Sequence, residues 1–572
     1  MNNSKYKNSL YDIREVADLR EMIDSCAYLY GDKEAFLVKD KPGGVYQNIS
    51  FNQLKRDIDA LGTALMEAGL KGKKVAVIGE NRYEWVISYF AVTNGMGVVV
   101  PIDRELPADE INKLLNRAGV SAVIFSGKYE KTVEKAVEGV PSMEFVIGMD
   151  AMDDDEDKIS LMKFMQKGHQ LLSDGNRDFL DAVIDPEAMA ALLFTSGTTG
   201  MPKGVMLSHK NFVSNVMYMS QYVGFTTEDR GLSILPMHHT YEMTCHIMTA
   251  LYQGLSIAIC EGLKYIVKNM AESQATVMLG VPLVFEKMHK KVWKQAESSG
   301  KAKKMRRAVK ISKVLGGENI KATKKLFGAV HSAMGGKMAL FIAGGAPIDP
   351  EVIKDFNAMG MNMIQGYGMT ENAPIIAVSR DRYHKADSVG RPLPGTEVKI
   401  IDADDDGIGE IICKGPSVMI GYYEDPQATG EVLKDGWLYT GDYGYLDSEG
   451  MLYVTGRKKN LIVTKNGKNI SPEEIEYYAL KSPYIEEIIV WGKYDEKSGD
   501  TVVCADIFPS TEHIKKMHKE LSPGQLEAIL DAEVEKVNEI MPMYKRIKRF
   551  STRDEEFEKT TSQKIKRHSI QH

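Results

Sequence analysis

"KKVAVIGENRYEWVISYFAVTNGMGVVVPI", residues 73–102, indicates the fold class of this chain. Residues 73–79 are a short apolar run that predicts a buried strand, and residues 81–95 follow with a helical pattern that ends at Gly95. A second apolar run, residues 96–102, predicts the next strand. Strand, helix and strand in this order form a βαβ unit, which favours a mainly parallel sheet covered by helices.

Similar apolar runs repeat the pattern through the first three quarters of the chain. They lie at residues 120–127, 143–150, 189–197, 231–236, 255–260, 275–282 and 338–345. Closely spaced strand patterns with Gly turns follow at 397–402, 409–415 and 451–456, and they predict a small antiparallel sheet or barrel. Residues 461–572 have a compact α+β pattern. Gly and charged residues at 455–460 interrupt the apolar periodicity, so we place a domain boundary there.

The composition limits the classes of function. The length of 572 residues predicts roughly three to five domain-sized units, and 43% hydrophobic with 26% charged residues is ordinary for a soluble protein. Nucleic acid binds basic surfaces, so a formal net charge of -7 leads us to expect no nucleic-acid partner.

Cysteine usage and hydropathy suggest the compartment. The five cysteines form no C-x-x-C pair, which favours a reducing cytosol without structural zinc or disulfides. The N-terminus lacks the apolar region of a secretion signal, and no stretch approaches the ~18 apolar residues of a spanning helix. We therefore expect a cytoplasmic protein that meets a membrane only peripherally.

Residues 192–209, "LLFTSGTTGMPKGVMLSH", place a Gly-rich and hydroxyl-rich loop directly after an apolar run. Backbone N–H groups and hydroxyls of such a loop can wrap triphosphate oxygens, and Lys203 adds a positive charge. The loop is not a Walker loop, because Pro202 and Gly204 flank the lysine and keep a helix from starting on it. We expect a mobile loop that closes over a nucleotide, with a plain Gly-rich turn as the alternative.

Three further motifs carry groups that suit a nucleoside triphosphate. "QGYGMTE" at 365–371 supplies an aromatic ring, a hydroxyl and a carboxylate, "YTGD" at 439–442 a carboxylate, and "GRKKN" at 456–460 an arginine. In this order, the motifs resemble the adenylate-forming superfamily of acyl-CoA synthetases, luciferases and carrier-protein adenylation domains. The resemblance covers nearly the whole chain, from "YGDKEAFLVKD" to "SQKIKR", and extends to bacterial long-chain fatty acyl-CoA synthetases.

This resemblance implies that different segments of the chain form domains with different functions. It implies an AMP-binding and acyl-binding domain at 1–455, a hinge at 456–460 and a mobile C-terminal domain at 461–572. It implies ATP and CoA as substrates and Mg²⁺ as the metal. The nucleotide-binding residues it implies are Thr195, Ser196, Gly197, Thr198, Thr199, Gly200, Lys203, Gly344, Gly345, Ala346, Tyr367, Gly368, Thr370, Asp442 and Arg457.

The same resemblance implies individual roles at the nucleotide. Tyr367 would pack against adenine beside the backbone of 344–346, and Thr370 would contact the α-phosphate. Glu371 would position Mg²⁺, which neutralises the phosphate oxygens. Asp442 would accept hydrogen bonds from the ribose, with Arg457 close by.

"LPMHHTYEMT" at 235–244 resembles the aromatic or histidine motif of the family. The resemblance makes His239 the motif histidine, which would line the acyl and pantetheine path, with Glu242 at the motif's end. His238 is interpreted as a structural histidine. A third ligand is missing from the spacing, so we expect no metal here.

The implied chemistry is activation of a carboxylate by ATP in two half-reactions. Because the substrate carboxylate attacks the α-phosphorus itself, positioning and charge stabilisation suffice and no nucleophilic Ser or Cys is needed. "EKTTSQKIKR" at 558–567 resembles the signature that carries the catalytic lysine, which selects Lys564 and leaves Lys566 as a distant alternative; Glu558 and Gln563 replace the usual Pro and Gly. The implied hinge residue is Lys459, and Gly467 would let backbone approach pantetheine closely.

Two segments bear on the acyl substrate. "VPLVFEKM" at 281–288 resembles a segment of long-chain fatty acyl-CoA synthetases, so we expect a medium-chain to long-chain fatty acid. Residues 287–325 hold fourteen Lys and Arg against two acids, and such a run is either a solvated helical face or a surface for an anionic membrane.

The chain is therefore interpreted as an ATP-dependent fatty acyl-CoA ligase. One alternative is a ligase that loads a carrier protein or stops at acyl-AMP. Another is a non-catalytic acyl-binding or nucleotide-binding relative.

Overall fold

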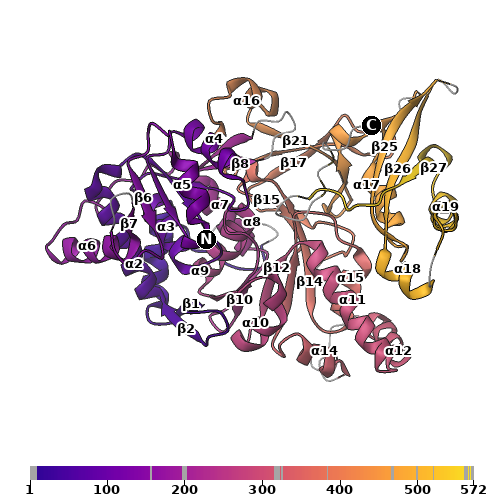
Figure 1. The fold of residues 1–572 in the computed structure, drawn as a ribbon, viewed down its shortest axis with the longest axis horizontal. Coiled ribbons are helices and arrows are strands. Elements are labelled where there is room, and N and C mark those ends of the chain that lie inside the picture. The colour runs from indigo at the N-terminus through magenta and orange to yellow at the C-terminus, as the bar shows by residue number, and fades with distance from the viewer. Residues whose placement is uncertain are drawn as a thin grey trace. The chain divides into compact units, whose positions relative to one another are not determined.

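The computed structural model describes residues 9–154, 158–195, 202–314, 323, 326–382, 384–465, 469–496, 500–518, 521–559, 565 and 567. The chain forms two compact units (Figure 1). Unit 1 comprises Met1–Glu397 and Lys414–Leu438, and unit 2 comprises Val398–Cys413 and Tyr439–His572. The strands at 398–413 and 439–455, which the sequence analysis assigns to the first domain, group with unit 2. The boundary and hinge at 455–460 stay predictions.

The described part of unit 1 contains an eight-stranded sheet built around the predicted βαβ unit. In spatial order its strands are β19 (Gly421–Tyr422), β9 (Lys203–Ser208), β8 (Met189–Thr195), β4 (Val98–Pro101), β3 (Lys74–Ile78), β5 (Ala122–Phe125), β6 (Phe145–Gly148) and β7 (Ile159–Ser160). All pairs from β8 to β7 are parallel, whereas β9 is antiparallel to both β8 and β19. The helix between β3 and β4, α3 (Tyr83–Thr93), is buried over most of its length because it is apolar on nearly every side.

A second sheet of unit 1 has nine strands among the described residues. In spatial order they are β16 (Arg391–Pro392), β15 (Ile375–Val378), β14 (Asn362–Gly368), β13 (Leu340–Ala343), β12 (Val277–Gly280), β10 (Arg230–Ser233), β11 (Ser256–Ile259), β1 (Glu34–Lys39) and β2 (Tyr46–Ser50). The pairs from β14 to β1 are parallel, and the outer pairs on both sides are antiparallel. The carboxyl ends of neighbouring parallel strands share one edge, where a ligand site of an α/β sheet usually forms.

Helices cover both sheets of unit 1 (Figure 1). They include α1 (Leu19–Tyr30), α2 (Phe51–Leu65), α4 (Ala108–Ala118), α5 (Glu130–Val137), α6 (Leu161–Ser173), α7 (His209–Ser220), α8 (Thr240–Glu242), α9 (Thr249–Gln253), α10 (Ile266–Ser273), α11 (Pro282–Ser298), α12 (Ala302–Val314), α14 (Gly328–Ala333), α15 (Pro350–Ala358) and α16 (Pro426–Val432). The described part of unit 1 also contains the short helices η1 (Met66–Leu70), η2 (Gly127–Tyr129), η3 (Met243–Met248), η4 (Leu263–Tyr265) and η5 (Thr370–Asn372) and the strand β20 (Leu433–Lys434). Helix α15 packs on β14, and α11 and α12 pack on α15.

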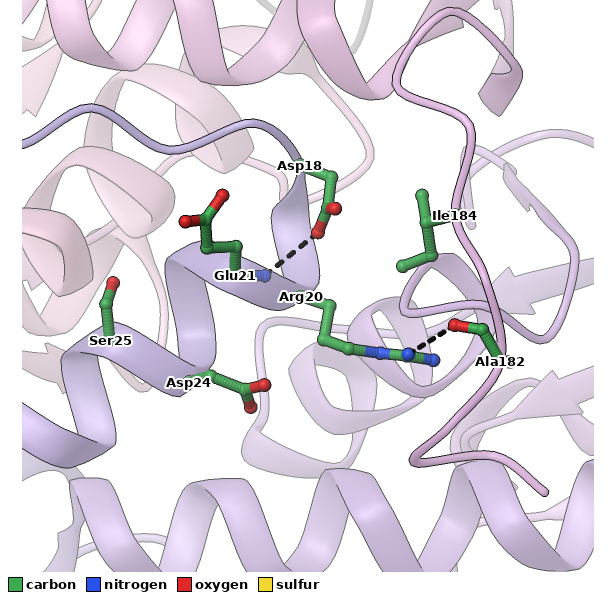
Figure 2. Close-up of a pocket in the computed structure, with 7 residues that line it drawn as sticks. All are labelled: Asp18, Arg20, Glu21, Asp24, Ser25, Ala182 and Ile184. Carbon is green, nitrogen blue, oxygen red and sulfur yellow. Dashed lines mark hydrogen bonds between the residues drawn. The ribbon is translucent and has the colours of Figure 1, made fainter. Parts of the chain in front are cut away.

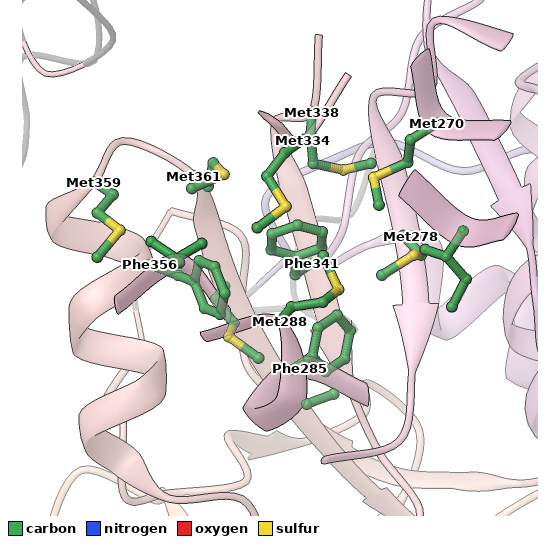
Figure 3. Close-up of a cluster of buried hydrophobic side chains, with 14 of the residues drawn as sticks. Met270, Met278, Phe285, Met288, Met334, Met338, Phe341, Phe356, Met359 and Met361 are labelled. Atoms are coloured by element: carbon green, nitrogen blue, oxygen red, sulfur yellow. The ribbon is translucent and has the colours of Figure 1, made fainter. Parts of the chain in front are cut away.

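The core beside β12, β13 and β14 is rich in methionine. Figure 3 shows Met270, Met278, Met288, Met334, Met338, Met359 and Met361 gathered around Phe285, Phe341 and Phe356. Methionine has three rotatable bonds and fills irregular gaps between aromatic rings. The Phe341 ring lies between the other two phenylalanines, with centroids 5.3 Å from each.

Unit 2 contains the predicted antiparallel strands and an α+β segment. Its elements are β17 (Glu397–Ile401), β18 (Gly409–Lys414), β21 (Trp437–Leu446), β22 (Leu452–Arg457), η6 (Lys458–Asn460), β23 (Ile462–Val463), β24 (Asn469–Ile470), α17 (Pro472–Ala479), β25 (Ile485–Asp495), β26 (Asp500–Pro509), α18 (Thr511–Met517), α19 (Pro523–Ile540), η7 (Met543–Lys545) and β27 (Ile547–Thr552). Strands β21 and β22 pair antiparallel, as expected. Helix α17 packs on β25, and α19 packs on α17 and β27.

The predicted α/β fold class is confirmed by the two mainly parallel, helix-covered sheets. The parallel pairing of β26 with β27 has no counterpart in the sequence analysis. Of the helices in the described part of the chain, none has the length and apolar character needed to cross a membrane.

Candidate active site

The predicted phosphate loop is bracketed by a strand hairpin. Strand β8 ends at Thr195 and β9 begins at Lys203, and these two residues are paired in register. The Thr195 hydroxyl donates to the Lys203 carbonyl oxygen at 3.5 Å. Ser196, Gly197, Thr198, Thr199 and Gly200 lie outside the described residues. The expectation that no helix starts on Lys203 is confirmed, because β9 starts there and α7 starts only at His209.

The acidic motif lies in a tight turn at the end of β14. A Cβ atom at Gly368 would lie 2.1 Å from the Pro374 carbonyl oxygen, so only glycine fits. The Met369 N–H donates to that same oxygen at 2.9 Å, and the Ala373 N–H donates to the Thr370 carbonyl at 3.1 Å. This turn presents Thr370 and Glu371, both half-buried, at the carboxyl edge of the sheet.

A tyrosine that the sequence analysis missed joins the acid to the lysine. The Tyr422 hydroxyl donates to Glu371 Oε1 at 2.8 Å, and Lys203 Nζ lies 4.7 Å from the centroid of the Tyr422 ring. Burial, together with the nearby Glu371 carboxylate, raises the pKa of Tyr422 above its usual range, so the hydroxyl stays protonated and donates. The structure therefore brings Lys203 and Glu371, predicted separately, into one cluster.

Two asparagines of α7 hold the segments that carry this cluster. Asn215 Nδ2 donates to the Ile375 carbonyl at 2.9 Å and to the Asn372 carbonyl at 3.2 Å. Asn211 Nδ2 donates to the carbonyls of Pro416 and Val418 at 2.7 Å and 2.8 Å. Both side chains are buried, so each satisfies backbone groups that water cannot reach.

The predicted adenine-side residues share one edge of the nine-stranded sheet. Strands β13 and β14 are parallel, with Ala343 opposite Gln365, so residues 344–346 and Tyr367 follow at neighbouring strand ends. A Cβ at Gly344 would lie 2.8 Å from the Tyr241 ring, and Gly345 has φ +83°. The Tyr241 hydroxyl donates to the Ile342 carbonyl at 2.9 Å. A side chain at 344 would therefore collide with Tyr241, and the positive φ of residue 345 favours glycine. Gly344 is buried, whereas Gly345 and Ala346 are exposed.

The two adjacent histidines precede α8 and differ in surroundings. Their ring centroids are 4.1 Å apart, and His238 Nε2 lies 3.7 Å from Asp103 Oδ2. Burial lowers the pKa of His238 well below its usual range, in keeping with a structural histidine. His239 is half-buried, and its predicted place on the acyl path stays a prediction. Glu242 is buried and pairs through Oε1 with His246 Nδ1 at 2.9 Å.

In unit 2, the predicted ribose-binding acid and its arginine are neighbours across a strand pair. Asp442 on β21 faces Arg457 on β22, with Arg457 Nε 3.2 Å from Asp442 Oδ1. Gly441 has φ +68°, and the Asp442 N–H donates to the Thr440 hydroxyl oxygen at 3.1 Å. The prediction that Arg457 lies close to Asp442 agrees with this geometry.

The predicted hinge and lysine segment also belong to unit 2. Lys459 lies in η6, and its burial lowers its pKa. Lys559 pairs with Ile565 in an antiparallel bridge, and Arg567 forms an ion pair with Glu476 and donates to the Val490 carbonyl at 3.1 Å. Gly467 and Lys564 lie outside the described residues.

A cavity of about 250 Å³ lies elsewhere in unit 1. Figure 2 shows it between the start of α1 and residues 182–184, lined by Asp18, Arg20, Glu21, Asp24, Ser25, Ala182 and Ile184. The Arg20 guanidinium donates to backbone carbonyls, among them Ala182 at 2.6 Å and Phe179 at 2.6 Å. The Arg20 guanidinium is therefore used in hydrogen bonds that hold the backbone. None of the predicted site residues lines this cavity.

The carboxylate of this cluster that could hold a metal ion is Glu371. Within the described residues, no group of three or more His, Cys, Asp or Glu side chains is arranged to hold a metal ion. Mg²⁺ is usually bound by only one or two carboxylates together with substrate phosphates. A half-buried Glu371 with one oxygen fixed by Tyr422 fits that requirement.

Sequence comparison identifies the family. The family described as AMP-binding enzyme matches residues 23–423, and its C-terminal domain matches residues 459–572. The chain belongs to the AMP-binding enzyme family. The resemblance inferred from the motifs is thereby confirmed.

Named relatives of this AMP-binding enzyme include two kinds of fatty acid ligase. Long-chain-fatty-acid–CoA ligase 1 of Cavia porcellus is 31% identical over 504 residues, covering 83% of this chain and 71% of the relative. A chloroplastic long-chain-fatty-acid–[acyl-carrier-protein] ligase of Arabidopsis thaliana is 27% identical, covering 90% of this chain and 79% of the relative. An anthranilate CoA ligase in complex with anthranoyl-AMP shares the fold, with TM-score 0.76 at 19% identity over 97% of this chain and 96% of that chain.

Proposed function

We propose that this AMP-binding enzyme is an AMP-forming fatty acyl-CoA ligase. The observation that carries the proposal is the cluster of Lys203, Tyr422 and Glu371 beside the stems of the predicted phosphate loop. A cation for phosphates and an acid for Mg²⁺ are the two charges that attack on ATP requires. The long-chain-fatty-acid–CoA ligases among the relatives support the substrate class.

In the first half-reaction, a fatty acid carboxylate oxygen attacks the α-phosphorus of ATP. The bond from that phosphorus to the bridging oxygen breaks, and pyrophosphate leaves with the electron pair. Lys203, Thr195 and the loop would bind the phosphates, Thr370 would contact the α-phosphate, and Glu371 would hold Mg²⁺. The metal supplies charge neutralisation when it is bound.

The residues assigned to the nucleoside are those that the family motifs imply. Tyr367 would stack on adenine, with the backbone of residues 344–346 and Gly368 beside it. Asp442 would accept hydrogen bonds from the ribose hydroxyls, with Arg457 Nε 3.2 Å from its Oδ1.

In the second half-reaction, the CoA sulfur attacks the acyl carbon and AMP leaves with the bonding electrons, while the thiol proton passes to solvent. We assign Lys564 to the first half-reaction, Lys459 to the pivot between the two, and Gly467 to the approach of pantetheine. His239 would line the acyl and thiol path.

Two properties separate this proposal from its alternatives: the thiol that accepts the acyl group, and the length of the fatty acid. The carrier-protein ligase among the relatives keeps a carrier-bound thiol as the second candidate acceptor. A panel of fatty acids from two to eighteen carbons, with CoA or phosphopantetheinylated carrier protein, tests both points. We expect pyrophosphate release and thioester formation with CoA, strongest for medium and long chains.

The results of the panel discriminate between the candidates. Thioester formed only on carrier protein would reject CoA as the acceptor. Release of no pyrophosphate with any acid, despite ATP binding, would favour a non-catalytic relative.

We further propose that the outer face of α11 and α12 meets an anionic membrane. Exposed cations on these helices and the turn between them include Lys287, Lys290, Lys291, Lys294, Lys301, Lys303, Lys304, Arg306, Arg307 and Lys310. On α12 they accompany two exposed apolar side chains, Ile311 and Val314. Residues 315–322, 324 and 325 of the basic segment lie outside the described residues.

The opposite face of α12 is attached to the protein. Lys313 pairs with Glu351 at 3.0 Å and with Asp355 at 2.8 Å, and Val309 is buried in the core. A helix fixed on one side, with cations and apolar groups on the other, has the character of an interfacial helix. Fatty acids partition into membranes, so such a surface would bring the enzyme to its substrate.

A further inference from the structure

Three chain segments meet at Tyr422 in unit 1. Lys203 begins β9, Glu371 lies in η5, and Tyr422 ends β19, which pairs with β9. The tyrosine contacts the other two through different parts of its side chain. Its hydroxyl donates to Glu371 Oε1 at 2.8 Å, and its ring lies 4.7 Å from Lys203 Nζ.

Lys203 and Glu371 form no direct ion pair with each other, although the structure describes both side chains. Opposite charges in a partly buried site attract strongly and tend to pair. A pair of this kind would neutralise the cation and the acid before a nucleotide arrives. Tyr422 offers each of them a different partner, a ring face for the ammonium group and a hydroxyl for the carboxylate.

The tyrosine itself is held in place by the surrounding strands. It is 6% exposed, and its N–H donates to the Thr429 hydroxyl oxygen at 2.9 Å. Tyr422 lies opposite Val205, and the Tyr423 N–H donates to the Gly204 carbonyl at 2.7 Å. The Tyr422 ring is therefore fixed in position and has little freedom to move towards Lys203 or Glu371. A side chain fixed in this way preorganises a binding site.

We propose that Tyr422 is a positioning residue that keeps Lys203 and Glu371 apart, so that both charges meet one Mg²⁺-bound nucleoside triphosphate. The inference rests on the nucleotide-binding part of the proposed function and is independent of the acyl acceptor. Loss of the hydroxyl frees Glu371 to pair with Lys203, and the site then loses affinity for both metal and phosphate.

The test is Tyr422→Phe in the full-length protein, with Tyr423→Phe as the matched control. Tyr423 is the next residue, and its ring faces Lys74 at 5.1 Å instead of the cluster. Binding of Mn²⁺ together with a non-hydrolysable ATP analogue is followed by electron paramagnetic resonance. We expect about tenfold weaker binding in Tyr422→Phe, the scale of one lost hydrogen bond to a charged group, and unchanged binding in Tyr423→Phe.

Two further measurements separate positioning from general support of the fold. In a Glu371→Ala background, Tyr422→Phe is expected to have almost no additional effect on Mn²⁺-nucleotide binding, because the tyrosine acts through the acid. Thioester formation from supplied acyl-AMP is expected to stay at the wild-type rate, because that step uses no metal-bound triphosphate.

Several outcomes would overturn the inference. Equal Mn²⁺-nucleotide binding by wild type and Tyr422→Phe, or absence of such binding in the wild type, contradicts it. If the unfolding temperature falls in Tyr422→Phe but not in Tyr423→Phe, the hydroxyl has a structural role. The same holds if Tyr422→Phe weakens Mn²⁺-nucleotide binding equally in the wild-type and Glu371→Ala backgrounds. If no acid releases pyrophosphate while the Mn²⁺ result holds, the ligase proposal fails and this inference stands.

Discussion

Glu371 accepts a hydrogen bond from the Tyr422 hydroxyl through Oε1, at 2.8 Å, and in the proposed reaction it would hold Mg²⁺. Glu371→Gln removes the negative charge with little change of shape. We expect acyl-AMP formation to fall roughly 10- to 1,000-fold, the range for one lost electrostatic stabiliser. Single-turnover pyrophosphate release measures it, with Glu67→Gln, an exposed acid on η1, as the control. An unchanged rate in Glu371→Gln would remove the acid from the mechanism.

The pKa of the buried His209 side chain, at the start of α7, lets us predict how the stability of the fold changes at acidic pH. Burial lowers its pKa to about 4, with Arg20 adding to the effect and Asp18 and Asp185 opposing it. Between pH 6.5 and 4 the unfolded chain binds a proton here and the folded chain does not, so stability is lost as pH falls through this window. The loss is on the order of 3 kcal/mol for a shift of this size.

His209→Gln is expected to flatten this part of the pH profile. The measurement is the thermal unfolding midpoint of wild type and variant at intervals from pH 4 to 8. Because other groups titrate in the same range, the difference between the two profiles is the quantity to compare. Parallel profiles would mean that His209 is protonated equally in both states.

At the scale of elements, the sequence pattern predicts the parallel strands well and the antiparallel edges poorly. Buried parallel strands are continuous apolar runs, such as residues 73–79, and these are visible in sequence. Strand β19 has only two residues, Gly421–Tyr422, and β16 likewise has two, Arg391–Pro392. Segments this short carry no periodicity, so only their tertiary partners define them as strands.

Helix α12 carries the prediction about membranes. Lys303→Glu with Arg307→Glu reverses two exposed cations on its outer face, and Lys515→Glu with Lys516→Glu makes the same charge change on α18. In co-sedimentation, wild type and the α18 variant are expected to bind anionic vesicles and the α12 variant to bind at least several-fold less. We expect 0.5 M salt to release the wild type, because screening then acts over about 4 Å. Equal binding to neutral vesicles would indicate a solvated face.

At the scale of the whole molecule, the proposed reaction assigns two lysines of unit 2 to different steps. Lys564→Ala is expected to slow acyl-AMP formation severely and to spare thioester formation from supplied acyl-AMP. Lys459→Pro fixes φ near -65° and removes one backbone donor at the predicted pivot. It is therefore expected to spare acyl-AMP formation and to slow thioester formation from supplied acyl-AMP. Paired single-turnover assays, for pyrophosphate release and for acyl-CoA, measure both effects. Equal impairment of both steps in both variants would point to general damage of unit 2.

The sequence by itself determined the α/β class, the absence of a helix start at Lys203, and the family. These depend on local information: apolar periodicity, the Pro and Gly around Lys203, and motifs read in order. The resemblance to the family also implied Asp442 with Arg457 close by, and the pairing of β21 with β22 agrees with this.

Only the tertiary structure decided how the charged groups of unit 1 are held. Tyr422 lies far along the chain from both Lys203 and Glu371, and Asn215 reaches the acidic turn from a helix after β9. Hydrogen bonds and cation–π contacts act only over a few ångströms, so they depend on which strands become neighbours. The pairing of β19 with β9 creates that proximity, and nothing in the local sequence around Tyr422 specifies it.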